Sequence, residues 1–164
     1  MRSAILLITM LCSCNLYADI DLAEMQKYEE FDSWIYEAFP FGSPATEGKI
    51  IELGKLIEST EEEYSVGHAA NPLKSVTYRF PGLEVCAIVE QTETKKAHVT
   101  QITISSSNWV LSNGIAIGQS LSVLSKLPVS PHEGTLNYCG AANCIEFQAK
   151  GNIINAIKVN LYAD

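Results

Sequence analysis

Hydrophobic side chains recur every three or four residues between positions 20 and 39. They are Leu22, Met25, Tyr28, Phe31, Ile35 and Ala38. This period gathers them on one stripe, so it predicts an amphipathic helix over residues 20–39. Asp19 and Asp21 suit its N-terminus as caps and as charges facing the helix dipole. Pro40 ends the helix.

From residue 73 the period of the pattern changes to two. Val76, Tyr78 and Phe80 alternate with polar Thr77 and Arg79, as in a strand with one buried face. The alternation predicts an antiparallel meander of three strands. Its strands are 73–80, 83–91 and 97–107, joined by turns at Pro81–Gly82 and 92–96.

A second unit of the same kind follows. Leu121, Leu124 and Leu127 lie three residues apart and predict a short helix over 119–127, which Pro128 and Pro131 end. Alternating apolar positions then predict a second meander. Its strands are 134–139, 144–149 and 152–162, with turns at 140–143 and 150–152.

The order of helix and strands indicates an α+β fold. We expect antiparallel meanders, with the N-terminal amphipathic helix and the second short helix on one sheet face. Residues 48–66 are ambiguous: Ile50–Leu53 fits a strand or a helical turn, and Glu61–Glu63 fits an exposed turn or a strand edge. The two units favour diverged halves, 19–112 and 113–164.

The first 18 residues have the pattern of a secretory signal peptide. Arg2 precedes an apolar run, Ala4–Leu11, and small and polar residues lead to Ala18, just before the acidic Asp19. Cleavage after Ala18 leaves a single domain of residues 19–164, free in the periplasm or secreted.

A lipoprotein signal is the alternative for this segment. Leu11-Cys12-Ser13-Cys14 resembles a bacterial lipobox, in which Cys14 would be lipidated and become the first mature residue. The polar tether common after such cysteines is missing, since Leu16 and Tyr17 follow almost at once. The alternative is an anchored protein, because an acyl chain tethers it to the membrane.

The cysteines of the mature region predict one disulfide. Cys139 and Cys144 flank Gly140–Asn143, four small or turn-forming residues typical of a hairpin tip. Facing positions on antiparallel strands lie within disulfide reach, so we expect Cys139 to pair with Cys144 in an oxidising compartment. Cys86 lies in a strand-like run and is expected to be a buried thiol. A metal or redox role is not favoured, because no second Cys pair or His pair accompanies them.

Charge is divided unevenly along a chain that is globular in composition, with 47% apolar and 18% charged residues. Residues 19–63 hold 13 Asp/Glu against 3 Lys, a net charge of −10, whereas residues 64–164 have a net charge of +1 from 7 Lys/Arg and 6 Asp/Glu. This argues against nucleic-acid binding. It permits an acidic surface for a basic protein partner, or simply a solvated helix face. No apolar run reaches the length of a membrane span.

Motifs for catalysis are absent from the sequence. His68, His98 and His132 are not spaced as metal ligands, and the chain has no nucleophile elbow, phosphate loop or dinucleotide fingerprint. We therefore expect a protein that is not an enzyme and binds no cofactor. A hydrolase with a site built from non-contiguous residues stays an alternative.

The second unit carries a resemblance to known envelope proteins. It rests on hydrophobic spacing and glycines in Asn113–Ser120, a short helix, Tyr138, Ile145–Phe147, Gly151 and Ile154–Val159. Residues 113–160 resemble the helix-then-meander unit of proteins related to the outer-membrane assembly lipoprotein SmpA or OmlA. The β-lactamase inhibitory proteins resemble this unit too and carry it twice. The resemblance implies an exported, non-enzymatic protein that binds other proteins, and it transfers no binding residue.

These observations favour a protein-binding domain of the cell envelope, of the inhibitor, immunity or assembly type. Aromatic side chains often anchor interfaces, although each one singly is better explained by core packing. The candidates for an interface are Trp34, Tyr36, Phe39, Phe41 and Trp109. A small-molecule-binding domain with a pocket between helix and sheet is the alternative.

Overall fold

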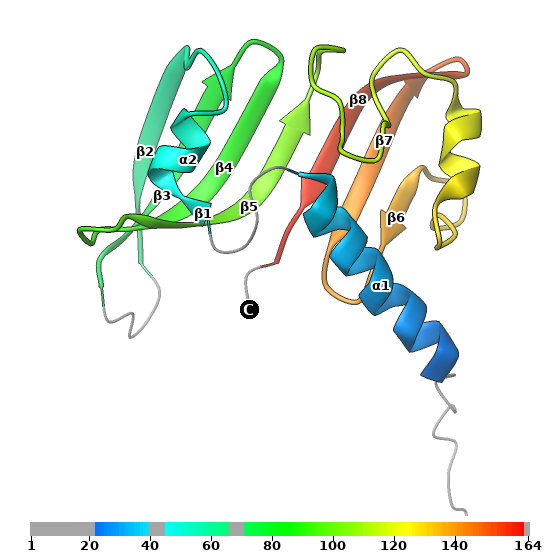
Figure 1. The fold of residues 1–164 in the computed structure, drawn as a ribbon, viewed down its shortest axis with the longest axis horizontal. Helices are drawn as coiled ribbons and strands as arrows, with labels where there is room; N and C mark the ends of the chain where they lie inside the picture. Colours follow the sequence, from blue (N-terminus) through cyan, green and yellow to red (C-terminus); the bar gives the residue numbers. More distant parts are fainter. Residues whose placement is uncertain (1–21, 40–44, 66–70, 163–164) are drawn as a thin grey trace, which may run out of the picture.

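The computed structural model describes residues 22–39, 45–65 and 71–162. The predicted signal peptide, Cys14, Phe41 and His68 lie outside these residues. Within them the fold is mixed α+β, dominated by one antiparallel sheet (Figure 1). The helices are α1 (Leu22–Ala38), α2 (Glu47–Ile51) and the 3-10 helix η1 (Leu121–Lys126). The strands are β1 (Ala45–Thr46), β2 (Glu58–Tyr64), β3 (Leu73–Phe80), β4 (Leu83–Glu90), β5 (Lys96–Ile104), β6 (Asn137–Cys139), β7 (Cys144–Lys150) and β8 (Ile153–Asn160).

The two predicted meanders form a single sheet. Its strand order is β2-β3-β4-β5-β8-β7-β6, with the short β1 paired to β5. The last strand of the first meander, β5, pairs with the last strand of the second, β8, over Gln101–Ile104 and Ile157–Asn160. The buried stripes of both meanders therefore lie on the same sheet face, because Ile102 pairs with Val159 and Ile104 with Ile157.

The two bulges of the sheet lie at symmetrical positions about this seam. The register between β4 and β5 skips Thr100, and the register between β7 and β8 skips Asn155. Both skipped residues lie three positions before the cross-strand pair Thr103–Lys158, so a two-fold axis through that pair would place one bulge on the other. A duplicated unit would produce this symmetry, and the diverged halves stay a prediction.

One face of the sheet carries the core. Inward side chains of all the long strands except β2 form one cluster with Phe31, Ile35 and Ala38 of α1 and Ile50 of α2. Both helices lie on this side of the sheet, α2 over β3 and β4 and α1 beside β6 and β7 (Figure 1). α2 begins where Thr46 Oγ1 accepts the backbone N–H of Lys49, a regular N-cap.

Several predicted boundaries need correction. The ambiguous segment 48–66 contains both α2 and the edge strand β2. The predicted helix over 119–127 is the 3-10 helix η1, and β6 begins at Asn137 instead of 134. The chain before β6 is occupied by a turn in which the backbone N–H and the hydroxyl of Thr135 both bond to His132 O.

The expectation for Cys86 is wrong. It pairs with Thr77 on β3 and Gln101 on β5, and it alternates with the buried Val85 and Ala87. Its thiol therefore lies on the uncovered face of the sheet, partly exposed and 3.6 Å from Thr77 Oγ1.

Candidate functional site

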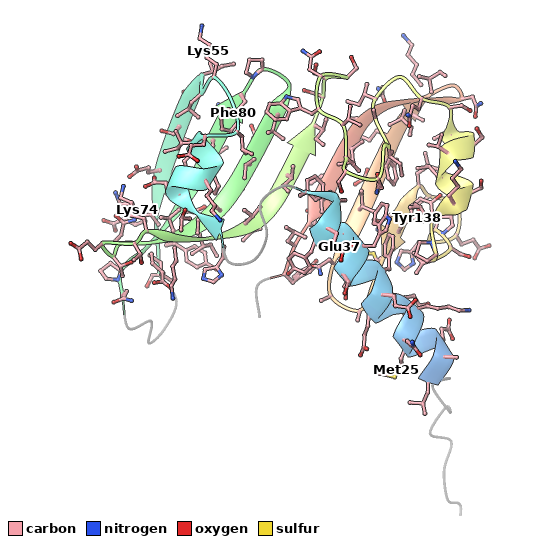
Figure 2. The ribbon with its side chains drawn as sticks, in the orientation of Figure 1. Met25, Glu37, Lys55, Lys74, Phe80 and Tyr138 are labelled. Atoms are coloured by element: carbon pink, nitrogen blue, oxygen red, sulfur yellow. A yellow bond between two sulfur atoms is a disulfide. The ribbon has the colours of Figure 1, made fainter. Side chains whose placement is uncertain are left out.

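Only the second half of α1 is buried. Phe31, Ile35 and Ala38 pack in the core, whereas every residue from 22 to 30 is exposed, including Leu22 at 81%, Met25 at 43% and Tyr28 at 37%. Figure 2 places Met25 on the part of the helix that extends past the strands. The apolar stripe predicted from the sequence thus extends beyond the part of α1 that packs in the core.

A hollow of about 600 Å³ lies beside this exposed half. Glu24, Lys27 and Tyr28 line it from α1, segment 128–133 lines the opposite side, and Cys139 and Gly140 line it from the β6–β7 hairpin. The segment follows η1, which Pro128 and Pro131 cannot continue. We call residues 22–30 and this hollow the α1 surface.

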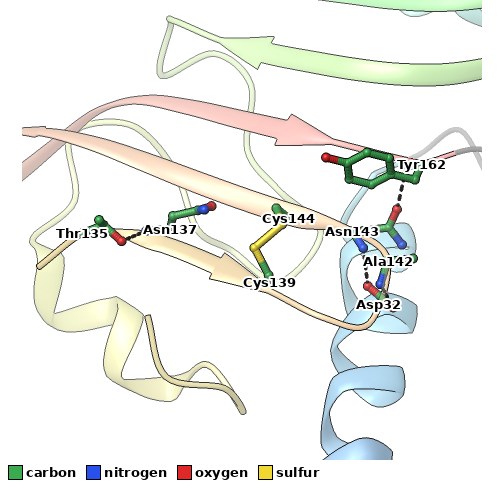
Figure 3. The surroundings of a disulfide bond; sticks show 8 residues. All are labelled: Asp32, Thr135, Asn137, Cys139, Ala142, Asn143, Cys144 and Tyr162. Atoms are coloured by element: carbon green, nitrogen blue, oxygen red, sulfur yellow. Dashed lines mark hydrogen bonds between the residues drawn. A yellow bond between two sulfur atoms is a disulfide. The ribbon is translucent and has the colours of Figure 1, made fainter. Parts of the chain in front are cut away.

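The predicted disulfide between Cys139 and Cys144 is present at the tip of the β6–β7 hairpin (Figure 3). The tip is also held by α1. Asp32 accepts the backbone N–H of Ala142 through Oδ2 at 2.9 Å and that of Asn143 through Oδ1 at 2.8 Å. The side chain of Asn143, which is 1% exposed, accepts the backbone N–H of Tyr162 at 3.1 Å. These bonds connect α1, the hairpin tip and the end of β8, and we call them the Asp32 clamp.

Gly140 lets the tip approach the helix closely. A Cβ at this position would lie 2.2 Å from Asp32 Oδ1 and 2.7 Å from the carbonyl oxygen of Tyr28. Only glycine fits between the hairpin and α1, since both distances are far below van der Waals contact.

A second, smaller hollow lies farther along α1. Its volume is about 170 Å³, and its walls are the apolar side chains of Trp34, Ile115, Val123 and Leu127. Trp34 is half-buried and stacks on Phe31 with ring centroids 5.2 Å apart. Asn113, Gly114, Gln119 and Lys126 complete the lining.

The four predicted interface aromatics that the structure describes do not gather in one patch. Trp34 faces the small hollow, Tyr36 is exposed on α1, and Phe39 is buried in the core. Trp109 packs edge-on against Phe80 and donates its indole N–H to Pro81 O at 2.8 Å. The interface itself stays a prediction.

Most acidic residues of the described first half lie on two elements, and Glu47 and Glu52 lie at the two ends of α2. α1 carries Glu24, Glu29, Glu30, Asp32 and Glu37 against one lysine, Lys27. The edge strand β2 carries four glutamates and is exposed throughout. Lys74 bonds to Glu61 and lowers the pKa of that carboxyl, and Arg79 bridges Glu58 and Glu84.

A partly buried polar network holds the start of α2. Tyr78 donates its hydroxyl to Glu47 Oε1 at 3.1 Å, and Lys95 Nζ lies 2.6 Å from Glu47 Oε2. Burial first, and then the negative charge of Glu47, raise the pKa of Tyr78 well above its usual range.

The two histidines among the described residues lie in different parts of the fold. His132 lines the large hollow, whereas His98 lies on β5 with Nε2 3.9 Å from Glu90 Oε1. Within residues 22–39, 45–65 and 71–162, no group of three His, Cys, Asp or Glu side chains is placed to hold a metal ion. In the same ranges no helix has the length and hydropathy needed to cross a membrane.

Sequence reasoning did not single out Asp32, Gly140, Asn143 or Lys126. Asp32 is one of five acidic residues of α1, and its partners follow 110 and 111 residues later, so no local pattern marks it. The small and polar tip 140–143 was the only available indication of a close contact.

Comparisons with known proteins assign the chain to no family. No family model and no curated protein matches the chain. The crystal structure of the uncharacterized protein yfeY from Escherichia coli aligns with 12% identity and a TM-score of 0.38. The alignment covers 76% of this chain and 95% of that one.

Proposed function

We propose that this chain is an exported protein-binding domain and that the α1 surface is its contact site. The observation that carries the proposal is the exposure of Leu22, Met25 and Tyr28 beside a hollow of about 600 Å³. The helix face that enters the core at Phe31 turns toward the hollow at Tyr28 and Glu24, one and two turns earlier. Apolar side chains left uncovered next to a concavity are typical of interaction sites.

The site is built on rigid supports. The Asp32 clamp holds α1 directly below its exposed half, and the disulfide closes the hairpin that supplies Cys139 and Gly140 to the hollow. A pre-ordered surface loses little conformational entropy when it binds, which favours affinity.

The chemistry of the partner follows from charge. Five acidic residues and one lysine on α1 give the helix a net charge of −4. A basic protein surface would be attracted to it, and the attraction would raise the association rate at low ionic strength. The resemblance of residues 113–160 to envelope proteins that bind other proteins favours the same class of partner.

Export is the second part of the proposal. A disulfide persists in oxidising compartments, and the pattern of residues 1–18 is that of a signal peptide. The intact mass of the protein from a Gram-negative host tests this. A chain beginning at Asp19 means a free periplasmic or secreted domain, a lipidated Cys14 means an anchored one, and an uncleaved Met1 contradicts export.

Site-specific crosslinking tests the contact site. A benzophenone amino acid is placed at position 28, or at position 155 as a control, since exposed Asn155 lies on β8 away from α1. Irradiation of living cells of the native host should give one discrete adduct from position 28 only, and added salt should weaken the complex in extracts. Equal adducts from both positions, or none from position 28 in a folded protein, would contradict the proposal.

A further inference from the structure

The small hollow beside Trp34 has the size of one hydrocarbon group. Its volume is about 170 Å³, and Trp34, Ile115, Val123 and Leu127 supply its walls. An apolar cavity of roughly 150 Å³ in a protein accepts a molecule the size of benzene. A ring or an alkyl chain of four to six carbons therefore fits this space.

The polar groups in the lining are largely engaged within the protein. Gln119 accepts the N–H of Ala116 at 3.1 Å and donates to Gly114 O at 2.9 Å. Asn113 accepts the N–H of Ile115 through Oδ1 at 3.0 Å. These bonds orient the loop around the hollow. They leave few polar groups in the lining that need a hydrogen-bond partner from a ligand.

Lys126 is the one charged residue that lines the small hollow. Among the described residues its ammonium group makes no ion pair. An unpaired cation at an apolar hollow selects ligands that combine an anion with a hydrocarbon group.

We propose that the small hollow binds a free monocarboxylic acid with a hydrocarbon group of four to six carbons. The hydrocarbon group lies against Trp34, Val123 and Leu127, and the carboxylate pairs with the Lys126 ammonium. This site is separate from the α1 surface, because the two hollows share no lining residue.

The expected affinity is modest. Hexanoate has eight heavy atoms, and at about 0.5 kcal/mol for each atom it would bind with a dissociation constant of roughly 1 mM. The ion pair with a solvent-accessible lysine contributes up to about 1 kcal/mol, or about a fivefold change in affinity.

Trp34 is itself the reporter for the test. The chain has two tryptophans, so fluorescence of a Trp109→Phe variant comes from Trp34 alone. Hexanoate, hexan-1-ol and hexylammonium are titrated at constant ionic strength. We expect saturable changes with hexanoate near 1 mM, weaker binding of hexanol, and at least tenfold weaker binding of hexylammonium.

Two variants separate charge at the hollow from charge elsewhere. Lys126→Gln should weaken hexanoate binding about fivefold and leave hexanol binding unchanged. The control Lys27→Gln removes the same charge from the large hollow and should change neither. Amide chemical shifts of the unaltered protein provide a second measurement, in which hexanoate should perturb residues 113–127.

Three results would overturn the inference. The first is no saturable change up to 50 mM hexanoate by either measurement, and the second is equal binding of hexanoate and hexylammonium. The third is tighter binding of a peptide with a C-terminal leucine carboxylate than of hexanoate, because that would assign the hollow to a polypeptide end.

Discussion

Replacing Asp32 with alanine should destabilise the protein through the hairpin tip. The substitution removes two hydrogen bonds from a carboxylate to backbone N–H groups, at 2.8 and 2.9 Å. Hydrogen bonds to charged groups contribute about 1.5–3 kcal/mol each. Ala142 is exposed, so water replaces the hydrogen bond to its N–H. Asn143 is buried, so its N–H is left largely without a hydrogen-bond acceptor. Alanine is also the better helix former, so we expect a net loss of about 2–3 kcal/mol.

Urea denaturation followed by circular dichroism measures this loss. The matched control is Glu29→Ala, which removes the same charge one turn earlier from an exposed position whose side chain has no partner among the described residues. Glu29→Ala should change the free energy of unfolding by less than about 0.5 kcal/mol. If Asp32→Ala is no more destabilising than this control, the clamp does not stabilise the fold.

The clamp and the disulfide should be energetically coupled, since both order residues 140–143. Removing the disulfide by Cys139→Ala and Cys144→Ala should cost about 2 kcal/mol for so short a loop. Without the disulfide, residues 140–143 have more conformations. The bonds to Asp32 then form at a larger cost in conformational entropy. Asp32→Ala should therefore be less destabilising in this background, by about 0.5–1 kcal/mol. Strictly additive effects would mean that the two restraints act independently.

Three further predictions concern packing and pH. Gly140→Ala should destabilise by at least about 2 kcal/mol in urea denaturation, because its Cβ meets Asp32, whereas Gly48→Ala in α2, with open space around it, should be neutral or stabilising. The pKa of Tyr78 is raised in the folded state, so stability should fall as the pH rises above 10, where the unfolded tyrosine loses its proton first; Tyr78→Phe should flatten that part of a stability–pH curve. Ile157→Ala at the seam between β5 and β8 should cost about 2–5 kcal/mol in a single transition, and two separate transitions would show that the halves unfold independently.

The periodic parts of the fold were predictable from the sequence. The stripe through Phe31 and Ile35 predicted α1, and alternation around Tyr78 and Phe147 predicted the strands, because buried faces require these periods. Cys139 and Cys144 were predictable as a pair because four turn-forming residues bring facing strand positions together. Cys86 was misjudged because an apolar run does not reveal which sheet face stays uncovered.

Contacts between distant segments were not predictable. No local feature of Gln101–Ile104 or Ile157–Asn160 indicates that β5 pairs with β8. Either strand would have the same apolar pattern if it lay at an edge of the sheet. The Asp32 clamp and the two hollows depend on where the second unit places residues 113–143 against α1. The site is therefore a property of the assembled halves, and no single motif encodes it.

The two halves of the sheet have matching bulges, but the helices that cover them differ in length. The meanders β3–β5 and β6–β8 have bulges at matching positions, Thr100 and Asn155, and β2 adds a fourth strand to the first half. The five-residue α2 lies over the first half, whereas the 17-residue α1 lies over the second and extends beyond it. Covering a meander thus does not require a helix as long as α1, and the core uses only its second half. Residues 22–30 contribute no side chain to the core, and this is where we place the contact with a partner protein.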